Sequence, residues 1–374
     1  MNSPNYIARR GKLRDGLGEC DSLLVTCENN VRYLTGFTGD SSYLLISSGG
    51  DENALLISDP RYDEQIQRQC PGLETHIRAP SEVLDTIAAE QINGRNLKRT
   101  GFESQHVTYD LYQRLKEACA CELAPTSQAV ESLRMIKDDS EIAILEQAVE
   151  IAQNAFVAMK SQLKADDCER DLAFSIESRI RALGGEGCSF NPIVAVGANA
   201  ALPHAEPGEN QIYESPLLLV DWGATVQGYR SDLTRLIFSG PTTGPGMAEI
   251  EDAYGAVLES QLAAIDMLGP GVQGSEVDAV VRDVLRRYGV EERFNHGLGH
   301  GIGLDIHESP RMGKNFPQPL QAGMVITVEP GVYFPGLGGI RIEDDVLVTK
   351  TGCRVLSSLP KDLDSSRISL GRAM

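Results

Sequence analysis

The sequence predicts an α/β (α+β) protein of two domains, and three observations support this fold class. The chain has 374 residues, which is long for a single hydrophobic core. Its first part alternates short apolar runs of strand type with segments of helical periodicity. Its second part combines long helical stripes with paired strands, so we expect two domains that each mix helix and sheet.

The first part predicts a small α/β domain that ends at a break in periodicity. Strands are expected at 22–27, 43–47 and 54–58, and helices at 82–91 and 111–120. The segment LAPTSQ at 123–128 fits neither period, and Pro125 disfavours a helix. We therefore place the linker there and predict domains at residues 1–128 and 129–374.

Helical stripes open the second domain. Apolar residues recur at intervals of three and four at Ile142, Leu145, Val149, Ala152, Phe156 and Met159. Asp138 and Glu141 form a capping pattern before this stripe. A second helix is expected from a cap at Asp166 or Asp167 to the Gly184-Gly185 pair. A third should cover 275–288 and end at Gly289.

Two strand pairs of similar design follow, and each carries two acids. The strand 217–220 leads into Asp221, a turn at Gly228 reverses the chain, and Asp232 begins the return strand 233–238. The strand 324–328 likewise leads into Glu329, and a glycine-rich turn at 336–339 precedes a return strand, 340–348, that carries Glu343. The hairpins can bring their carboxylates together.

Five residues are candidate metal ligands: Asp221, Asp232, His300, Glu329 and Glu343. Four carboxylates and one imidazole suit hard or borderline divalent ions, and they supply enough donors for two ions. An acid at the end of an apolar strand needs a partner. For a single acid, an arginine such as Arg235 or Arg341 could serve instead, but the combined pattern favours a metal.

Four histidines fall in the same region: His204, His296, His300 and His307. Histidine transfers protons near neutral pH, so several together indicate catalysis. The glycines of NHGLGHGIG disfavour a helix and predict a close-packed strand or loop. This segment fits neither GxGxxG nor a P-loop, and neither HExxH nor GxSxG occurs.

The composition limits the class of partner and the compartment. The chain is 41% hydrophobic and 23% charged, as in ordinary globular proteins. Its formal net charge of -19 disfavours nucleic acid and anionic lipid as partners. We found neither a signal peptide nor a run of about 18 apolar residues, and the eight cysteines lack the spacing of a disulfide scaffold or zinc site. We therefore expect a cytoplasmic protein without a membrane span.

Several segments closely resemble the prolidase and aminopeptidase P family of metallopeptidases. They are YLTGFTGDSSYLLI, ESLRMIKDDSEI, FNPIVAVGANAALPH, LLLVDWGA, SDLTR, HGLGHGIGLDIHESP, VEPGVY and GIRIEDD. Their order and spacing match that family over nearly the whole chain. The resemblance implies a creatinase-like N-terminal domain followed by a pita-bread catalytic domain.

The resemblance also implies roles for the candidate residues. Asp221 and Asp232 would hold one divalent ion, and His300 and Glu329 a second, with Asp232 and Glu343 bridging them. Manganese is expected first, and cobalt, iron or zinc are the other ions that the family uses. His204, His296, His307 and Arg341 match positions that bind substrate and stabilise developing charge. Ala205 follows His204 where many prolidases carry Tyr or Gly, so the resemblance implies the chemistry but leaves the substrate preference open.

The resemblance thus implies metal-dependent hydrolysis of Xaa-Pro bonds in a dipeptide or at the start of a longer peptide, by a homodimer. Glu329 is the candidate proton shuttle, and His204 or His307 would donate to the oxyanion. Two alternatives remain at this point. One is other chemistry on the same fold, such as creatinase-type C–N hydrolysis or a lyase reaction, and the other is a non-catalytic peptide-binding module.

Overall fold

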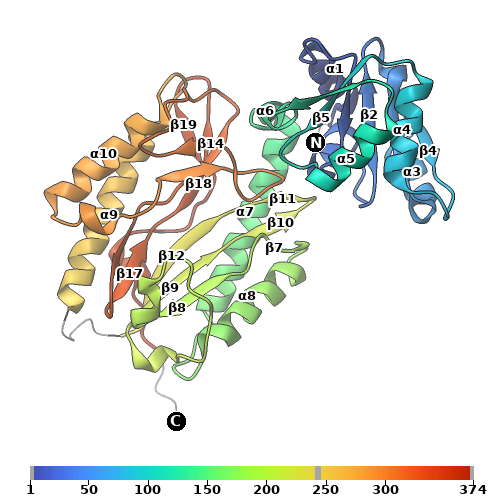
Figure 1. Cartoon of the computed structure of the whole chain (residues 1–374). Helices are drawn as coiled ribbons and strands as arrows, with labels where there is room; N and C mark the ends of the chain where they lie inside the picture. Colours follow the sequence, from blue (N-terminus) through green and yellow to red (C-terminus); the bar gives the residue numbers. More distant parts are fainter. Residues whose placement is uncertain (1–3, 241–245, 371–374) are drawn as a thin grey trace. The chain divides into compact units, whose positions relative to one another are not determined.

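The computed structural model describes residues 4–240 and 246–370, which form two compact units that divide after Arg134 (Figure 1). The division lies after Arg134, six residues later than the boundary predicted at 128/129. The short helix α6 (Glu131–Arg134) belongs to the first unit because both of its ends bind Asn30. Nη1 of Arg134 donates to Oδ1 of Asn30 at 2.7 Å, and Nδ2 of Asn30 donates to Oε1 of Glu131 at 2.7 Å.

The N-terminal unit is built on a six-stranded sheet of order β4-β3-β2-β1-β5-β6. The strands are β1 (Ser22–Val25), β2 (Tyr43–Ser47), β3 (Ala54–Ser58), β4 (Glu74–Ile77), β5 (Arg99–Glu103) and β6 (Glu122–Thr126). Its other helices are α1 (Tyr6–Asp15), α2 (Glu28–Thr35), α3 (Asp63–Gln69), α4 (Leu84–Gly94) and α5 (Tyr109–Ala118), with 3-10 turns η1 (Asp51–Asn53) and η2 (Pro60–Tyr62). The three predicted strands and two predicted helices are all present, with ends shifted by up to three residues.

The segment predicted as linker is instead largely the edge strand β6. Its residues pair in parallel with β5, and Pro125 lies opposite Phe102. Proline has no N–H to donate, so it is tolerated in a strand only where that position needs no ladder bond, as at a sheet edge. The prediction of a linker was wrong because it treated Pro125 as a break rather than as an edge residue.

In the C-terminal unit, the capping signals were read correctly for one helix and incorrectly for another. Asp138 and Glu141 form the predicted capping box of α7 (Asp139–Lys160). For α8 (Glu169–Ala182) the N-cap residue is Cys168, which makes no side-chain cap bond, so neither Asp166 nor Asp167 caps it. Instead, Oδ2 of Asp167 accepts from the N–H of Lys164, in the turn before the helix.

The remaining helices are α9 (Met247–Met267), α10 (Gly274–Arg287) and α11 (Leu363–Ser366), with 3-10 turns η3 (Gly197–Ala201), η4 (Ile212–Glu214) and η5 (Glu291–Arg293). Helix α10 matches the helix predicted at 275–288, and α9 was not identified from the sequence. By length and composition α7 could cross a membrane, but 56% of its most apolar window is buried inside the protein. Its predicted stripe faces the core, as in the central helix of a globular unit.

Strands of the C-terminal unit form two halves, each covered by a pair of helices (Figure 1). The half beside α7 and α8 contains β7 (Gly187–Cys188), β8 (Ile193–Val196), β9 (Leu217–Trp222), β10 (Ala224–Val226), β11 (Tyr229–Arg230) and β12 (Leu233–Phe238). The half beside α9 and α10 contains β13 (Gly299–Gly301), β14 (Glu308–Met312), β15 (Val325–Val328), β16 (Gly331–Phe334), β17 (Gly338–Arg341), β18 (Asp344–Val348) and β19 (Cys353–Val355).

Both predicted hairpins are present, and their acids lie within the strands or directly beside them. In the first, β9 pairs antiparallel with β12 so that Asp221 lies opposite Thr234. In the second, β15 pairs with β18 and β16 with β17. The chain leaves its ladders at Glu329 and Glu343, between these two pairs of strands. Trp222 packs behind the first hairpin, where its ring stacks on Phe156 at 4.4 Å and its Nε1 donates to the carbonyl of Ala152 at 2.8 Å.

Candidate metal centre

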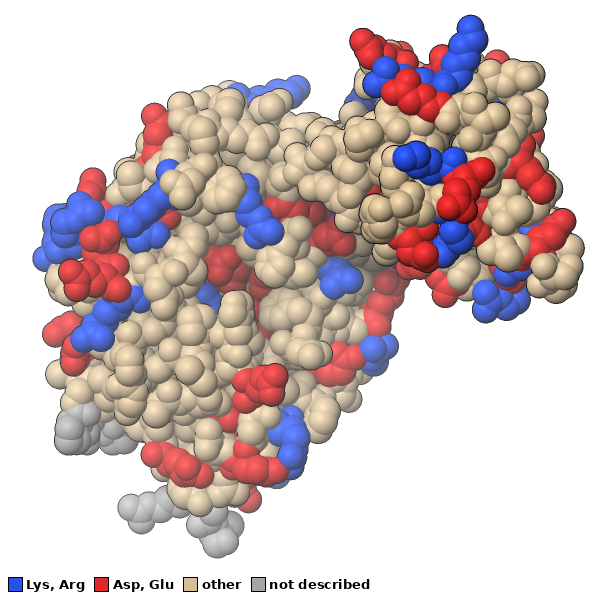
Figure 2. All heavy atoms as spheres, viewed as in Figure 1, with Lys and Arg blue, Asp and Glu red and all other residues tan. Residues whose placement is uncertain are grey.

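All nine predicted site residues line one pocket of the C-terminal unit, with a volume of about 1420 Å³. They are the five candidate ligands together with His204, His296, His307 and Arg341. Figure 2 shows this unit hollowed on one face, with Asp and Glu atoms visible inside the hollow. The sequence therefore identified residues from six separate segments that folding brings together.

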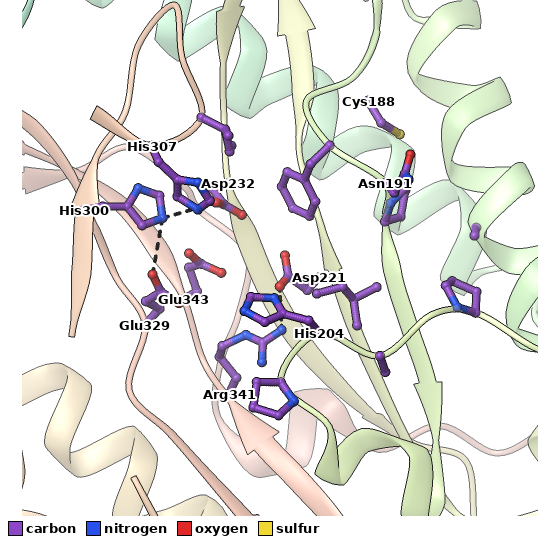
Figure 3. Close-up of a pocket in the computed structure, with 18 of the residues that line it drawn as sticks. Cys188, Asn191, His204, Asp221, Asp232, His300, His307, Glu329, Arg341 and Glu343 are labelled. Carbon is purple, nitrogen blue, oxygen red and sulfur yellow. Dashed lines mark hydrogen bonds and ion pairs between the residues drawn. The ribbon is translucent and has the colours of Figure 1, made fainter. Parts of the chain in front are cut away.

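Three of the five candidate ligands form a tight group. Asp232, His300 and Glu343 are buried, and each offers one donor atom within 4.8 Å of the others. Glu329 lies at their edge, because its Oε1 is 3.4 Å from Nε2 of His300, which is itself 3.8 Å from Oδ2 of Asp232. Figure 3 shows these side chains pointing toward a common space.

Asp221 stands beside this group but is held by an arginine. Nη2 of Arg341 donates to Oδ2 of Asp221 at 2.5 Å, and both side chains are nearly fully buried. The arginine pairing considered for a single acid is therefore real for one oxygen of Asp221. Its other oxygen, Oδ1, is buried and has no hydrogen-bond partner within residues 4–240 and 246–370. Arg235, the other arginine considered, pairs with Asp344 rather than with a candidate ligand.

Thr234 joins the two hairpins at the centre of the site. It lies opposite Asp221 in the β9–β12 ladder and forms an isolated antiparallel bridge with Glu343. Its hydroxyl donates to Oε2 of Glu343 at 2.6 Å, and its carbonyl accepts from the N–H of Glu343 at 3.3 Å. The backbone therefore fixes the separation between the acids of the two hairpins.

His300 is oriented for coordination by its own strand. Nδ1 lies 3.0 Å from the carbonyl oxygen of Gly301, which can only accept, so Nδ1 carries the proton and Nε2 presents a lone pair to the cluster. Burial lowers the pKa of His300 to about 3, so the ring is neutral near pH 7. A neutral imidazole with a free Nε2 is the form that binds a metal ion.

The glycines around His300 allow this strand to pack closely, as predicted for NHGLGHGIG. A Cβ on Gly299 would lie 2.1 Å from the carbonyl oxygen of Thr327. One on Gly301 would lie 2.2 Å from the carbonyl oxygen of Ser309. Both distances are far below van der Waals contact, so only glycine lets the backbone carry His300 this close to its neighbours.

The electrostatics of the cluster indicate missing positive charge. Burial, and then the charges of neighbouring acids, raise the pKa values of Asp232 and Glu343 well above the ordinary range. Burial also raises the pKa of Glu329 to about 7. Oδ1 of Asp232, like Oδ1 of Asp221, is buried without a hydrogen-bond partner among the residues described. Crowded, desolvated acids with orphaned oxygens fit one or two divalent cations in both charge and donor type.

Both nitrogens of His296 are engaged in hydrogen bonds, neither of them to a candidate metal ligand. Nδ1 donates to the carbonyl of Gly297 at 2.8 Å, so Nε2 accepts from the hydroxyl of Tyr333 at 3.0 Å. Tyr333 in turn accepts from Nη1 of Arg341 at 2.8 Å. Burial, and then the charge of Arg341, lower the pKa of His296 to about 4. In this arrangement His296 orients the Tyr333–Arg341 pair.

His204 and His307 are the exposed histidines of the pocket. His204 follows η3, and His307 lies in the loop between β13 and β14. The His307 ring meets that of His300 edge to face at a centroid distance of 4.4 Å (Figure 3). Both histidines are therefore placed to contact a substrate above the buried acids.

The sequence analysis missed several residues that shape the site. Asp345 accepts the backbone N–H of Asp232 at 3.0 Å, and burial raises its pKa well above the usual value. Thr234 and Tyr333 make the contacts described above. Arg311 lies opposite His300 in the β13–β14 ladder and lines the pocket with an exposed side chain. The doublet after Glu343 could have indicated Asp345, but no local signal distinguishes the other three.

Comparisons with known proteins agree with this geometry. Residues 143–350 match the model of metallopeptidase family M24, and residues 9–136 match the creatinase/prolidase N-terminal domain. The chain is 34% identical over 345 residues to the Xaa-Pro dipeptidase of Pyrococcus horikoshii, covering 92% of this chain and 94% of that protein.

Solved structures give the same result for the fold. A Xaa-Pro dipeptidase from Bacillus anthracis superposes with a TM-score of 0.90 at 38% identity, covering 96% of this chain and 99% of that one. An X-Pro aminopeptidase from Thermotoga maritima superposes with a TM-score of 0.84 at 33% identity, covering 93% and 98%. The two units are thus a creatinase-type N-terminal domain and a pita-bread domain, and the chain belongs to metallopeptidase family M24.

Proposed function

We propose that this metallopeptidase hydrolyses the Xaa-Pro peptide bond with two divalent ions. The observation that carries the proposal is the convergence of Asp232, His300 and Glu343 within 4.8 Å, with Glu329 and Asp221 beside them. This donor set lies in a chain whose full-length relatives include Xaa-Pro dipeptidases. The alternatives of metal-free chemistry or a purely binding role are not favoured, because the chain carries a suitable donor side chain at each of the five ligand positions.

The residues would divide between the two ions as the family resemblance implies. Asp221 and Asp232 would hold one ion, and His300 and Glu329 the other, with Asp232 and Glu343 shared. When bound, such a pair lowers the pKa of a water molecule toward neutrality and polarises the scissile carbonyl. Thr234, Asp345 and the carbonyl of Gly301 fix the orientation of three of these ligands.

Glu329 is the candidate proton carrier of the reaction. All three acids line the pocket, but Glu329 is only partly buried, whereas Asp232 and Glu343 are buried. Its Oε1 accepts from the hydroxyl of Thr327 at 3.2 Å, which leaves Oε2 available toward the pocket. Glu329 would take a proton from the attacking water and deliver it to the leaving proline nitrogen.

His204 and His307 would supply hydrogen bonds to the oxyanion. Both side chains reach the surface of the pocket. Partial desolvation there lowers the pKa of His307, which keeps its ring neutral near pH 7. A neutral imidazole still has one N–H to donate. One preorganised donor of this kind is typically worth about 3 kcal/mol of transition-state stabilisation.

A proline substrate suits a site that does not depend on gripping an amide hydrogen. The nitrogen of the Xaa-Pro bond belongs to the proline ring, so it is tertiary and carries no N–H. The pocket also contains aromatic and aliphatic side chains, including Phe190, Ile306 and Phe316, which can contact a pyrrolidine ring. Shape recognition of that ring would replace the missing hydrogen bond.

The proposal is tested by hydrolysis of Gly-Pro, Ala-Pro and Ala-Pro-Ala, first after chelation and then with manganese restored. We expect turnover of at least one substrate only in the presence of metal. Asp232→Ala should remove both bound metal and activity. Metal-loaded enzyme that cleaves none of the three peptides would exclude the proposed function, and full activity in Asp232→Ala would exclude the bridging role.

Arg311 provides a test of whether the enzyme prefers dipeptides. Paired residues of an antiparallel ladder project their side chains to the same face, so Arg311 lies on the His300 side of its sheet. Its cation could pair with the free carboxylate of a bound dipeptide. We expect Arg311→Gln to raise KM for Ala-Pro by about tenfold, the cost of about 1.4 kcal/mol, and to leave Ala-Pro-Ala nearly unchanged. Equal effects on both substrates would argue against this role.

We further propose manganese as the native metal, a homodimer and a cytoplasmic location. The carboxylate-rich donor set, without cysteine, supports a hard ion such as manganese. All eight cysteines are free, which suits a reducing compartment. The dimer rests on the family resemblance alone. Metal analysis of the purified protein would test the identity of the metal, and sedimentation analysis would test the dimer.

A further inference from the structure

We propose that Lys137 is a positioning residue that holds His307 at the metal centre through Glu308. The catalytic role of His307 in this inference rests on the proposed function. The structural coupling between Lys137 and the loop that carries His307 is independent of that function. Lys137 lies just before α7, far from the pocket lining in sequence, and Glu308 directly follows His307.

Lys137 and Glu308 form a buried ion pair across 171 positions of the chain. Nζ of Lys137 is 3.0 Å from Oε2 of Glu308, and the two side chains are 1% and 7% exposed. A buried ammonium and a buried carboxylate are each costly without a partner. Neither side chain can move away from the other without leaving a desolvated charge.

The lysine end of this pair is anchored to the central sheet of the C-terminal unit. The backbone N–H of Lys137 donates to the carbonyl of Gly323 at 2.8 Å. Gly323 in turn donates to the carbonyl of Val348, the last residue of β18. Lys137 is therefore fixed relative to β18, the strand that directly follows Glu343.

The glutamate end is fixed within the loop that carries His307. Oε1 of Glu308 accepts from the N–H of Asp305 at 3.1 Å, so the carboxylate closes the turn 305–308. The backbone of Gly303 packs directly against the same carboxylate, since a Cβ there would lie 2.7 Å from Oε1. The carboxylate of Glu308 thus connects three points of the loop to Lys137.

His307 has fewer constraints of its own. Its ring is exposed in the pocket and packs edge to face on His300. Its position therefore depends on the backbone between Asp305 and Glu308. Because a displacement of about 1 Å in a catalytic group can reduce a rate by about 100-fold, losing the ion pair should reduce turnover without removing a ligand.

The first experiment is a double-mutant cycle between Lys137→Met and His307→Ala. We expect Lys137→Met to lower kcat on the best Xaa-Pro substrate by about 10- to 100-fold with manganese content unchanged. In the His307→Ala background the same substitution should cost less than about 3-fold, because the group it positions is gone. Lys137→Arg should recover part of the loss. An equal loss in both backgrounds would overturn the proposal.

The second experiment needs neither metal nor activity. Hydrogen–deuterium exchange of chelated protein should show faster exchange in Lys137→Met for residues 302–309, with β9 and β12 unchanged. Unchanged exchange at 302–309 would overturn the inference. If the wild type hydrolyses no Xaa-Pro substrate, the proposed function fails, but this measurement still decides the coupling.

Two variants separate positioning from general destabilisation. The double variant Lys137→Met with Glu308→Met replaces the ion pair by apolar side chains, which is often neutral for stability. It should restore the melting temperature yet retain the low kcat. Arg10→Met breaks a different ion pair, in the N-terminal unit, where Arg10 binds Asp51 at 2.6 Å. It should lower stability and leave exchange at 302–309 unchanged, and faster exchange there would count against a specific role for Lys137.

Discussion

Two sets of buried acids in the C-terminal unit differ in whether the protein itself satisfies them. Glu169 is fully buried and accepts from the N–H of Val196 at 2.7 Å, from the N–H of Gly208 at 2.8 Å and from Asn199 at 3.0 Å. Asp232 is also buried, yet its Oδ1 has no hydrogen-bond partner among the described residues. The first acid completes the fold, whereas the second needs a cation from outside it.

The same contrast occurs between adjacent residues of β18. Asp344 binds Arg235 at 2.6 Å and Lys361 at 2.7 Å, and these cations lower its pKa although burial acts in the opposite direction. Burial raises the pKa of Asp345, which the N–H of Asp232 offsets only in part. Successive residues of a strand face opposite sides of the sheet. Asp344 therefore lies beside Arg235 and Lys361, and Asp345 lies beside Asp232 of the metal centre.

The largest expected difference in metal binding and stability is between two Glu→Gln variants, one at Glu343 in the metal centre and one at Glu169 in the fold. Glu343→Gln should abolish manganese binding and activity, because a shared ligand loses its charge. In chelated protein it should raise the melting temperature, since repulsion among the acids is reduced. Glu169→Gln should keep manganese binding but lose about 1–3 kcal/mol of stability, because its amide would face donors. Calorimetric metal titration and thermal unfolding measure both, and equal metal affinity in the two variants would break the comparison.

The acids themselves could be predicted from the sequence, but the partners that satisfy them could not. The strand-terminal acids and His300 were found because strand periodicity and residue type are local signals. The α/β class and the two hairpins followed from the same patterns. The partners of those residues were not found, because Thr234 and Glu343, or Lys137 and Glu308, meet only in three dimensions. The linker prediction at Pro125 was wrong for the same reason, because a strand tolerates proline only where, as in β6, it lies at the edge of the sheet.

A smaller difference is expected between Asp345→Asn and Asp344→Asn. Oδ2 of Asp345 accepts from the backbone N–H of Asp232 and so helps to orient this ligand. Loss of a hydrogen bond that orients a metal ligand typically reduces metal affinity by about 10- to 100-fold. Asp344→Asn instead removes the partner of Arg235 and Lys361, so it should mainly lower the melting temperature. Manganese titration alongside thermal unfolding compares the two, and a larger loss of affinity in Asp344→Asn would reverse the assignment.

The smallest effect concerns the pH dependence of stability in chelated protein. Burial raises the pKa of Glu329 to about 7 in the folded state, above its unfolded value of about 4.3. The folded state therefore binds more protons between these values, so this group's contribution to stability falls as pH rises from about 4 to 7. Glu329→Gln removes that contribution, and its melting temperature should decline less steeply over this range than that of the wild type. Manganese should stabilise the wild type more at pH 7.5 than at pH 5.5, because protons no longer compete for the acids.

For Asp344, whose folded pKa is lowered, the pH dependence has the opposite sign, since its contribution to stability is present above the unfolded pKa and is lost as pH falls. Identical pH profiles for Glu329→Gln and the wild type would show that Glu329 is not among the acids that need a cation.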